Sequence, residues 1–216
     1  MILLTRYLRG FNMAMSDKAV VYIHGKGGTA DAADYFRSFF PEYDMYGFDY
    51  RSEDPWEAVP EYKDYFTGLS EKYSSITVLA SSLGAYFLMI SGAGEMIQKA
   101  FFVSPIVNME RLIRDMMKRE DVSDEELMEK GTIRISESEI LSWDYLTWVR
   151  DHPIVWNVPT FILYGEKDHF QSLETIEAFA KATGVDLTVM PGGEHWFHTD
   201  EQTEFRKKWL DGFRGS

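Results

Sequence analysis

The residues of this sequence best suited to chemistry are a serine, an aspartate and a histidine that each follow a short apolar run. Along the chain they are Ser82, Asp168 and His195. A histidine can take the proton of a serine hydroxyl and later give it to a leaving group, while an aspartate holds the imidazole in the useful tautomer. The trio therefore predicts nucleophilic catalysis by Ser82, with His195 as base and Asp168 as its partner.

Two serines compete for the role of nucleophile. A serine on a tight strand-to-helix turn needs small residues two positions before it and two after it, because larger ones collide with neighbouring backbone. Ala80 and Gly84 stand there if Ser82 is the nucleophile, whereas two leucines would stand there around Ser81. The spacing favours Ser82. The alternative is a serine-rich helix cap, which is common in proteins.

A glycine-rich segment, His24–Gly28, follows the first apolar run of the chain. Such a turn lets backbone approach a substrate closely and can offer an N–H to a developing oxyanion. We expect an oxyanion hole formed by the backbone N–H groups of Lys26 and Leu83, with Gly27 as the alternative to Lys26. The glycine spacing matches neither a phosphate-binding loop nor a dinucleotide fingerprint, which makes a nucleotide-binding domain a weak alternative.

Other acids and bases are less well placed. Glu166 is the local rival of Asp168, while Asp144 and Asp151 lie in or beside a region without strands. Among the other histidines, His24 is assigned to the glycine loop and His152 to packing. His169 is assigned to the neighbourhood of the acid, and His198 to the start of the last helix.

No metal and no cofactor are expected. The sequence has no His-Glu-x-x-His motif, and its potential ligands are not clustered at ligand spacing. An improvised site built from Asp168, His169, Glu194 and His195 is a remote alternative.

The elements that must position these residues alternate between apolar strands and helices. Strands are predicted at 18–23, 44–48, 76–80, 100–103, 160–164 and 185–190, and helices at 31–40, 55–73, 83–93, 173–183 and 201–213. Alternation of this kind indicates an α/β fold, a mostly parallel sheet of about six strands with helices on both faces. The carboxyl ends of parallel strands share one edge, where the three side chains would meet.

One stretch interrupts this alternation. Residues 105–153 contain charged helical segments rich in methionine and no clear strand, which we interpret as a helical cap, either a lid over a site or merely a long crossover. We expect one domain, with a core of about 16–104 and 154–216. Residues 1–15 are interpreted as a loose extension, because two arginines interrupt their apolar stretch and no signal-peptide cleavage site follows.

Composition narrows the classes of function. Among 216 residues the net charge is −13, which argues against nucleic-acid binding, and no apolar run is long enough to cross a bilayer. The absence of cysteine excludes disulfides and thiolate chemistry and fits a cytoplasmic protein. Strongly anionic substrates are disfavoured unless Lys or Arg is focused locally. The oligomeric state, monomer or homodimer, is left open.

From about Lys18 to Phe213 the chain resembles the α/β-hydrolase superfamily in its nucleophile elbow, its glycine loop and its order Ser, Asp, His. The resemblance implies a reduced form of that fold, with Ser82, Asp168 and His195 as catalytic triad and a cap after the fourth strand. One departure is Ala80, where the family usually has glycine, from which we expect slight strain.

The predicted activity is that of a serine hydrolase of the carboxylesterase type, cleaving a small neutral or apolar carboxylic ester through an acyl-enzyme on Ser82. Thioester, lactone, amide or carbon–carbon cleavage is an alternative, as is a non-catalytic receptor for a small ligand. Candidate pocket residues come from the glycine loop, the cap and the surroundings of the acid and base: His24, Gly25, Gly27, Trp143, Trp148, His169 and Trp196.

Overall fold

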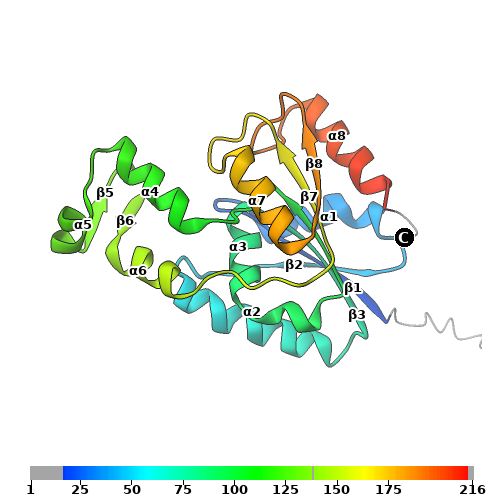
Figure 1. Cartoon of the computed structure of the whole chain (residues 1–216). Helices are drawn as coiled ribbons and strands as arrows, with labels where there is room; N and C mark the ends of the chain where they lie inside the picture. The colour runs from blue at the N-terminus through cyan, green and yellow to red at the C-terminus, as the bar shows by residue number, and fades with distance from the viewer. Residues whose placement is uncertain (1–16, 138, 214–216) are drawn as a thin grey trace, which may run out of the picture.

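The computed structural model describes residues 17–137 and 139–213, so the expectation for residues 1–15 lies outside the described part. Six parallel strands form one sheet in the order β2-β1-β3-β4-β7-β8 (Figure 1). The strands are β1 (Lys18–Ile23), β2 (Asp44–Phe48), β3 (Ser75–Ser81), β4 (Lys99–Val103), β7 (Thr160–Gly165) and β8 (Asp186–Met190). The predicted fold class is confirmed.

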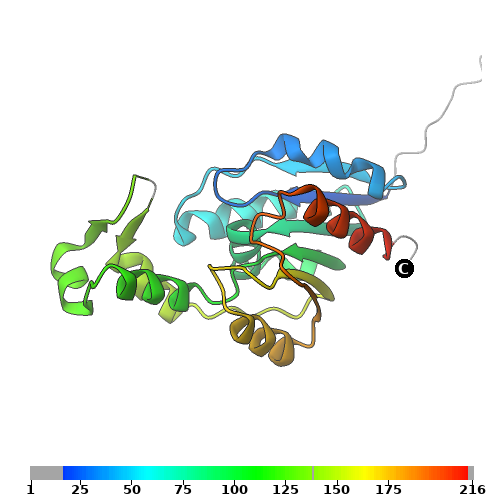
Figure 2. The same ribbon diagram turned by 90° about the horizontal axis from the view of Figure 1, so that it is seen from above.

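Helices cover both faces of this sheet (Figures 1 and 2). They are α1 (Ala33–Phe36), α2 (Pro55–Ser70), α3 (Ser82–Ile90), α7 (Leu173–Thr183) and α8 (Asp200–Asp211). Alternate strand residues pack into two separate cores: one includes buried side chains of α2, α3 and α7, and the other those of α1 and α8. Strands buried on both faces explain the near-continuous apolar runs of the sequence.

The predicted helix at 31–40 is irregular. Only the four residues of α1 are α-helical, and 3₁₀ turns flank them at Ala30–Ala32 and Arg37–Phe39. The buried residues Ala33, Phe36 and Phe39 recur every three residues, which suits three residues per turn better than 3.6.

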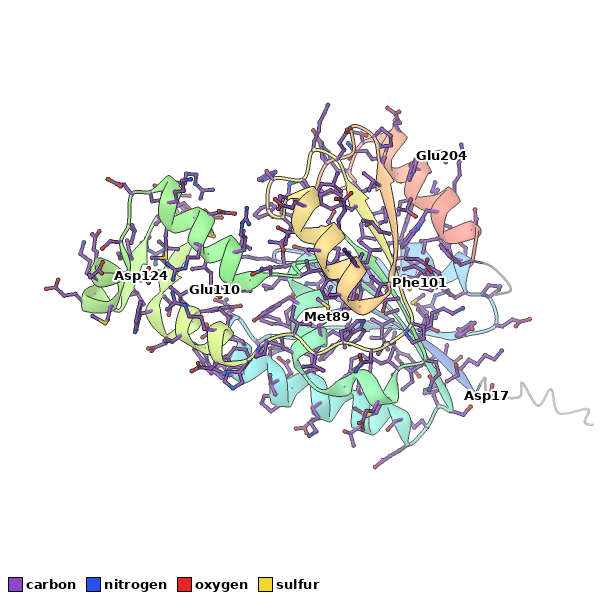
Figure 3. The ribbon with its side chains drawn as sticks, viewed as in Figure 1. Asp17, Met89, Phe101, Glu110, Asp124 and Glu204 are labelled. Carbon is purple, nitrogen blue, oxygen red and sulfur yellow. The ribbon has the colours of Figure 1, made fainter. Side chains whose placement is uncertain are left out.

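Between β4 and β7 the chain leaves the sheet and forms a cap that projects from one side of the molecule (Figures 1 and 2). It consists of α4 (Met109–Arg119), α5 (Asp124–Lys130), β5 (Thr132–Arg134), β6 (Ile140–Ser142) and α6 (Trp143–Asp151). The antiparallel pair β5–β6 was not expected. Figure 3 places Glu110 and Asp124 in this cap, away from Met89 and Phe101 of the body.

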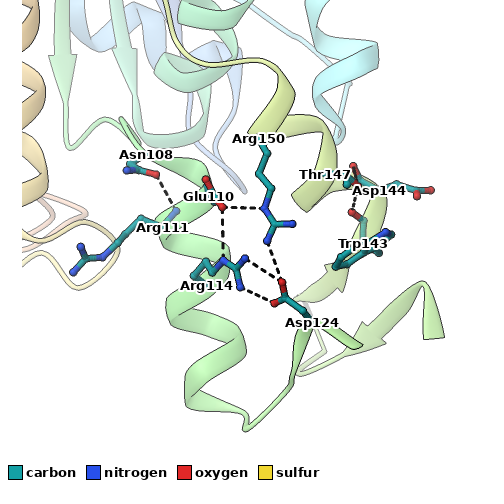
Figure 4. Close-up of polar contacts among 9 residues, drawn as sticks. All are labelled: Asn108, Glu110, Arg111, Arg114, Asp124, Trp143, Asp144, Thr147 and Arg150. Carbon is teal, nitrogen blue, oxygen red and sulfur yellow. Dashed lines mark hydrogen bonds and ion pairs between the residues drawn. The ribbon is translucent and has the colours of Figure 1, made fainter. Parts of the chain in front are cut away.

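A network of charged side chains joins the helices of the cap (Figure 4). The Arg150 guanidinium donates to Glu110 at 2.9 Å and to Asp124 at 3.3 Å. Arg114 donates to both oxygens of Asp124, at 2.6 and 3.1 Å. The network connects α4, α5 and α6, and because it is partly exposed we assign it to orienting these helices more than to stability.

None of the helices in the described ranges is long and apolar enough to span a membrane.

Candidate active site

The turn between β3 and α3 holds Ser82 in an uncommon backbone conformation. β3 ends at Ser81 and α3 begins with Ser82, whose φ is +48°. A left-handed residue other than glycine or asparagine costs on the order of 1 kcal/mol, so the surrounding packing must impose it. The side chain of Ser81 makes no capping hydrogen bond to α3. The serine-rich cap is therefore not what this pair of residues forms.

Gly84 lets α3 pass close to the end of β1. A Cβ at this position would lie 2.3 Å from the carbonyl oxygen of His24 and 2.8 Å from a methyl group of Ile23. On the other side of the serine, Ala80 is fully buried within β3 and has no positive φ, so alanine fits there without backbone strain. The requirement for small neighbours of Ser82 thus has its physical cause chiefly at Gly84.

We expect Gly84→Ala to lower the free energy of unfolding by about 3 kcal/mol, because its methyl group meets a backbone atom that cannot move aside. Gly68→Ala is the matched control, since a Cβ at this α2 position meets nothing within 4 Å. Removing a helical glycine there should raise stability by about 0.5–1 kcal/mol. Urea unfolding of the two variants measures both effects, and equal midpoints would contradict the close approach at Gly84.

The glycine loop lies directly beside Ser82. A Cβ on Gly25 would lie 3.0 Å from that of Ser82, so a side chain there would crowd the serine. His24 does not face the serine: its ring stacks on Tyr50 at 4.4 Å, and its Nδ1 donates to the Gly25 carbonyl at 2.8 Å. The histidine fixes the loop, and the glycine opens space above the nucleophile.

The structure brings Ser82, His195 and Asp168 into one hydrogen-bonded chain. His195 Nε2 lies 2.9 Å from Ser82 Oγ, and His195 Nδ1 lies 2.6 Å from Asp168 Oδ2. The side chains of His195 and Asp168 are only 2% and 1% exposed. Because a carboxylate only accepts, Nδ1 carries the proton and Nε2 is free to accept one from the serine.

The other oxygen of Asp168 is held by its own loop. Its Oδ1 accepts from the backbone N–H of Phe170 at 2.8 Å, with a longer contact from Gln171 at 3.4 Å. The rival acid Glu166 is exposed, and its Oε2 accepts from Gly192 N–H at 2.7 Å in the turn before His195. Each acid thus has a separate place, and only Asp168 reaches the imidazole.

Gln171, which the sequence did not single out, ties the loop of the acid to the start of the cap. Its Oε1 accepts from the backbone N–H groups of Val107 and Asn108 at 3.1 and 2.9 Å, and its carbonyl accepts from Tyr164 Oη at 2.7 Å. A lone glutamine three residues after an aspartate has no recognisable pattern, so only the contacts identify it.

Replacing this amide by an apolar side chain should destabilise the protein. In Gln171→Leu the buried N–H group of Val107 and the part-buried N–H group of Asn108 lose their acceptor, and we expect a loss of about 2–4 kcal/mol in unfolding free energy. Gln202→Leu is the matched control: that glutamine is also buried, but its Oε1 has no partner within the described part of the chain. Denaturant unfolding should show little change there, and a similar loss in both variants would show that the Gln171 hydrogen bonds are not the cause.

A cavity of about 280 Å³ lies over the serine and the histidine. Its lining comes from β1, the glycine loop, the β3–α3 turn, β4, the His195 loop and α8: Tyr22, Gly25, Lys26, Gly27, Gly28, Ser81, Ser82, Val103, His195, Trp196 and Arg206. Tyr22 and Val103 belong to the core on the α1 and α8 side of the sheet. The cavity therefore opens on that side.

The expected pocket residues divide accordingly. Gly25, Gly27 and Trp196 line the cavity, and Trp196 is 53% exposed at its edge. Trp143 and Trp148 do not line it, because the cap packs on the core of the opposite sheet face. Trp148 instead stacks on His152 at 4.0 Å. His24 is absent from the lining, as is the exposed His169, whose ring centre lies 6.5 Å from that of His195.

The two expected oxyanion donors lie on segments beside the serine. Lys26 lines the cavity, and Leu83 is the second residue of α3, where backbone N–H groups have no intrahelical acceptor. The positive end of the helix dipole points to the same place.

A positive charge, the Arg206 guanidinium, also lines the cavity. Burial raises the pKa of the Tyr22 phenol, and the Arg206 guanidinium partly opposes this rise.

Within the described residues no group of three or more histidines and acids could hold a metal ion.

No protein-family model matches the sequence, and no curated protein sequence matches it. Solved structures do match. Est1E from Butyrivibrio proteoclasticus is 16% identical with a TM-score of 0.68, covering 91% of this chain and 87% of its own. Alpha/beta hydrolase domain-containing protein 10 from mouse is 15% identical with a TM-score of 0.68, covering 90% and 88%. A Paleococcus ferrophilus monoacylglycerol lipase is 14% identical with a TM-score of 0.61, covering 92% and 95%. This chain therefore has the α/β-hydrolase fold.

Proposed function

We propose that this protein is a serine hydrolase that cleaves small carboxylic esters through an acyl-enzyme on Ser82. The observation that carries the proposal is the hydrogen-bonded chain from Ser82 Oγ through His195 to Asp168, at the base of a cavity. One of the similar structures is named a monoacylglycerol lipase, which agrees with ester hydrolysis. A cavity of about 280 Å³ suits a small substrate.

In the proposed reaction Ser82 Oγ attacks the ester carbonyl carbon while its proton passes to His195 Nε2. The tetrahedral oxyanion accepts hydrogen bonds from the N–H groups of Lys26 and Leu83. Asp168 stabilises the imidazolium, which then gives its proton to the departing alcohol. Water activated by His195 afterwards attacks the acyl-enzyme and releases the acid.

The test combines activity with active-site labelling. We expect turnover of p-nitrophenyl esters, falling as the acyl chain outgrows the cavity, together with labelling of Ser82 by a fluorophosphonate. Labelling without turnover of esters would direct the search to thioesters, lactones, amides or carbon–carbon bonds. A lack of both would favour a receptor that binds a small ligand without reaction.

A further inference from the structure

Arg206 is a part-buried guanidinium that lines the same cavity as Ser82 and His195. It reaches the cavity from the middle of α8, on the sheet face that α8 shares with α1. The rings of Tyr35 and Phe36 lie 5.5 and 5.4 Å from its Cζ, so aromatic faces hold the guanidinium in place. The guanidinium thus packs on two aromatic rings while it lines the cavity.

No carboxylate of the described residues pairs with this guanidinium. All the ion pairs seen among the described residues involve basic side chains other than Arg206. The Nε of Arg206 is buried and has no hydrogen-bond partner in that part of the chain. In a protein with 35 acidic and 22 basic residues, acids for a surface pair are abundant. A part-buried cation without a partner is costly unless a ligand supplies the opposite charge.

The rest of the lining brings no negative side chain to the cavity, since within the described chain it includes no aspartate or glutamate. Asp168 lies behind His195 with its side chain 1% exposed, so it faces the imidazole and not the cavity. Low-dielectric walls concentrate such a local field despite a net charge of −13.

We propose that the cavity selects esters that carry a free carboxylate, and that Arg206 is the residue that binds it. The inference rests on the proposed function for the reaction, while the anion site itself needs only the geometry of the cavity. Arginine matches a carboxylate through two parallel N–H donors, which gives orientation as well as affinity. The substrate would be a small half-ester or an acylated hydroxy acid. This substrate class differs from the neutral or apolar ester expected from the sequence.

Matched substrate pairs test the selection. Monomethyl glutarate against methyl glutaramate varies the charge on the acyl side, and acetoxyacetate against acetoxyacetamide varies it on the alcohol side. In each pair only a carboxylate is exchanged for an isosteric amide. For at least one pair we expect wild-type kcat/KM to favour the carboxylate by ~10- to 100-fold, the range of a charge-assisted hydrogen bond.

Variants of Arg206 locate the cause of this preference. Arg206→Met should bring the ratio within each pair close to one, and Arg206→Lys should restore part of it, since a lysine keeps the charge without the planar fork. Lys208→Met is the control: it removes a charge from the same helix at an exposed side chain paired with Glu204 at 3.7 Å. A wild-type ratio near one in both pairs, or a ratio that Arg206→Met leaves unchanged, overturns the inference.

A binding measurement separates this inference from the proposed reaction. Calorimetry on Ser82→Ala with the same four compounds reports binding without turnover. Tighter binding of a carboxylate than of its amide, lost when Arg206→Met is added, supports the anion site even if no ester is hydrolysed. Hydrolysis of esters with no preference in either experiment keeps the reaction and overturns the anion site. No detectable binding of either carboxylate also overturns it.

Discussion

Ser82→Ala should lower ester turnover by ~10⁴- to 10⁶-fold and abolish labelling by a fluorophosphonate, as removal of an activated serine does in hydrolases with such a triad. The fold should survive, because serine and alanine meet the same backbone strain at φ +48°. His195 then has no hydroxyl to deprotonate, although Asp168 still orients it. Initial rates on a p-nitrophenyl ester and mass spectrometry of the labelled protein measure the two effects.

Ser81→Ala is the control that this site offers. Ser81 lines the same cavity one residue earlier, but it ends β3 with an ordinary extended backbone and its side chain does not cap α3. We expect activity within ~10-fold of the wild type and full labelling. Labelling that disappears in Ser81→Ala and persists in Ser82→Ala would show that Ser81, and not Ser82, is the nucleophile.

Most of the sheet could be predicted because its strands are buried on both faces and therefore read as continuous apolar runs. The bounds of β1 and β2 match the predicted ranges, and those of β3, β4, β7 and β8 differ by a residue or two at most. The hairpin β5–β6 was not predicted because each of its strands has only three residues. Two residues of β5 and one of β6 are exposed. Short exposed strands leave no apolar run to recognise.

In the site, the catalytic residues could be predicted from the sequence, but the position of the cavity could not. Ser82, Asp168 and His195 could be found because each follows a strand, and the ends of parallel strands meet at one edge. The cavity could lie on the sheet face covered by α8 or on the face where the cap packs. Which face it uses depends on the face to which strand residues such as Tyr22 and Val103 point. No single segment contains this information.

Arg206 shows why the substrate side of a site is harder to predict than its chemistry. In the sequence it is one of several charged residues of an amphipathic helix, and its neighbours in the chain give no sign of a role. Its position becomes apparent only when α8 lies beside α1 and over the end of β1. A nucleophile needs a special backbone turn, whereas a side chain that binds substrate needs only the right place.

Asp168→Asn should lower turnover by about 10⁴-fold with little change in structure, because it reverses the tautomer of His195. The N–H groups of Phe170 and Gln171 hold Oδ1 at 2.8 and 3.4 Å and would keep the amide oxygen of asparagine there. The NH₂ group must then face His195 Nδ1, which becomes an acceptor. The imidazole proton moves to Nε2, and this nitrogen can then no longer accept the proton of Ser82. Nitrogen NMR of the imidazole, recorded beside the rate, reports this tautomer directly.

Glu166→Gln is the matched change, an acid-to-amide exchange two residues earlier in the same loop. A glutamine carbonyl can still accept from Gly192 N–H, as Glu166 Oε2 does at 2.7 Å, so the turn before His195 should persist. We expect a rate within ~3-fold of the wild type, as for other exposed substitutions. If Asp168→Asn kept more than a tenth of the activity, or if Glu166→Gln had the larger effect, the acid would be misassigned. The 2.6 Å contact between Asp168 and His195 would then be structural, and the base would need another source of orientation.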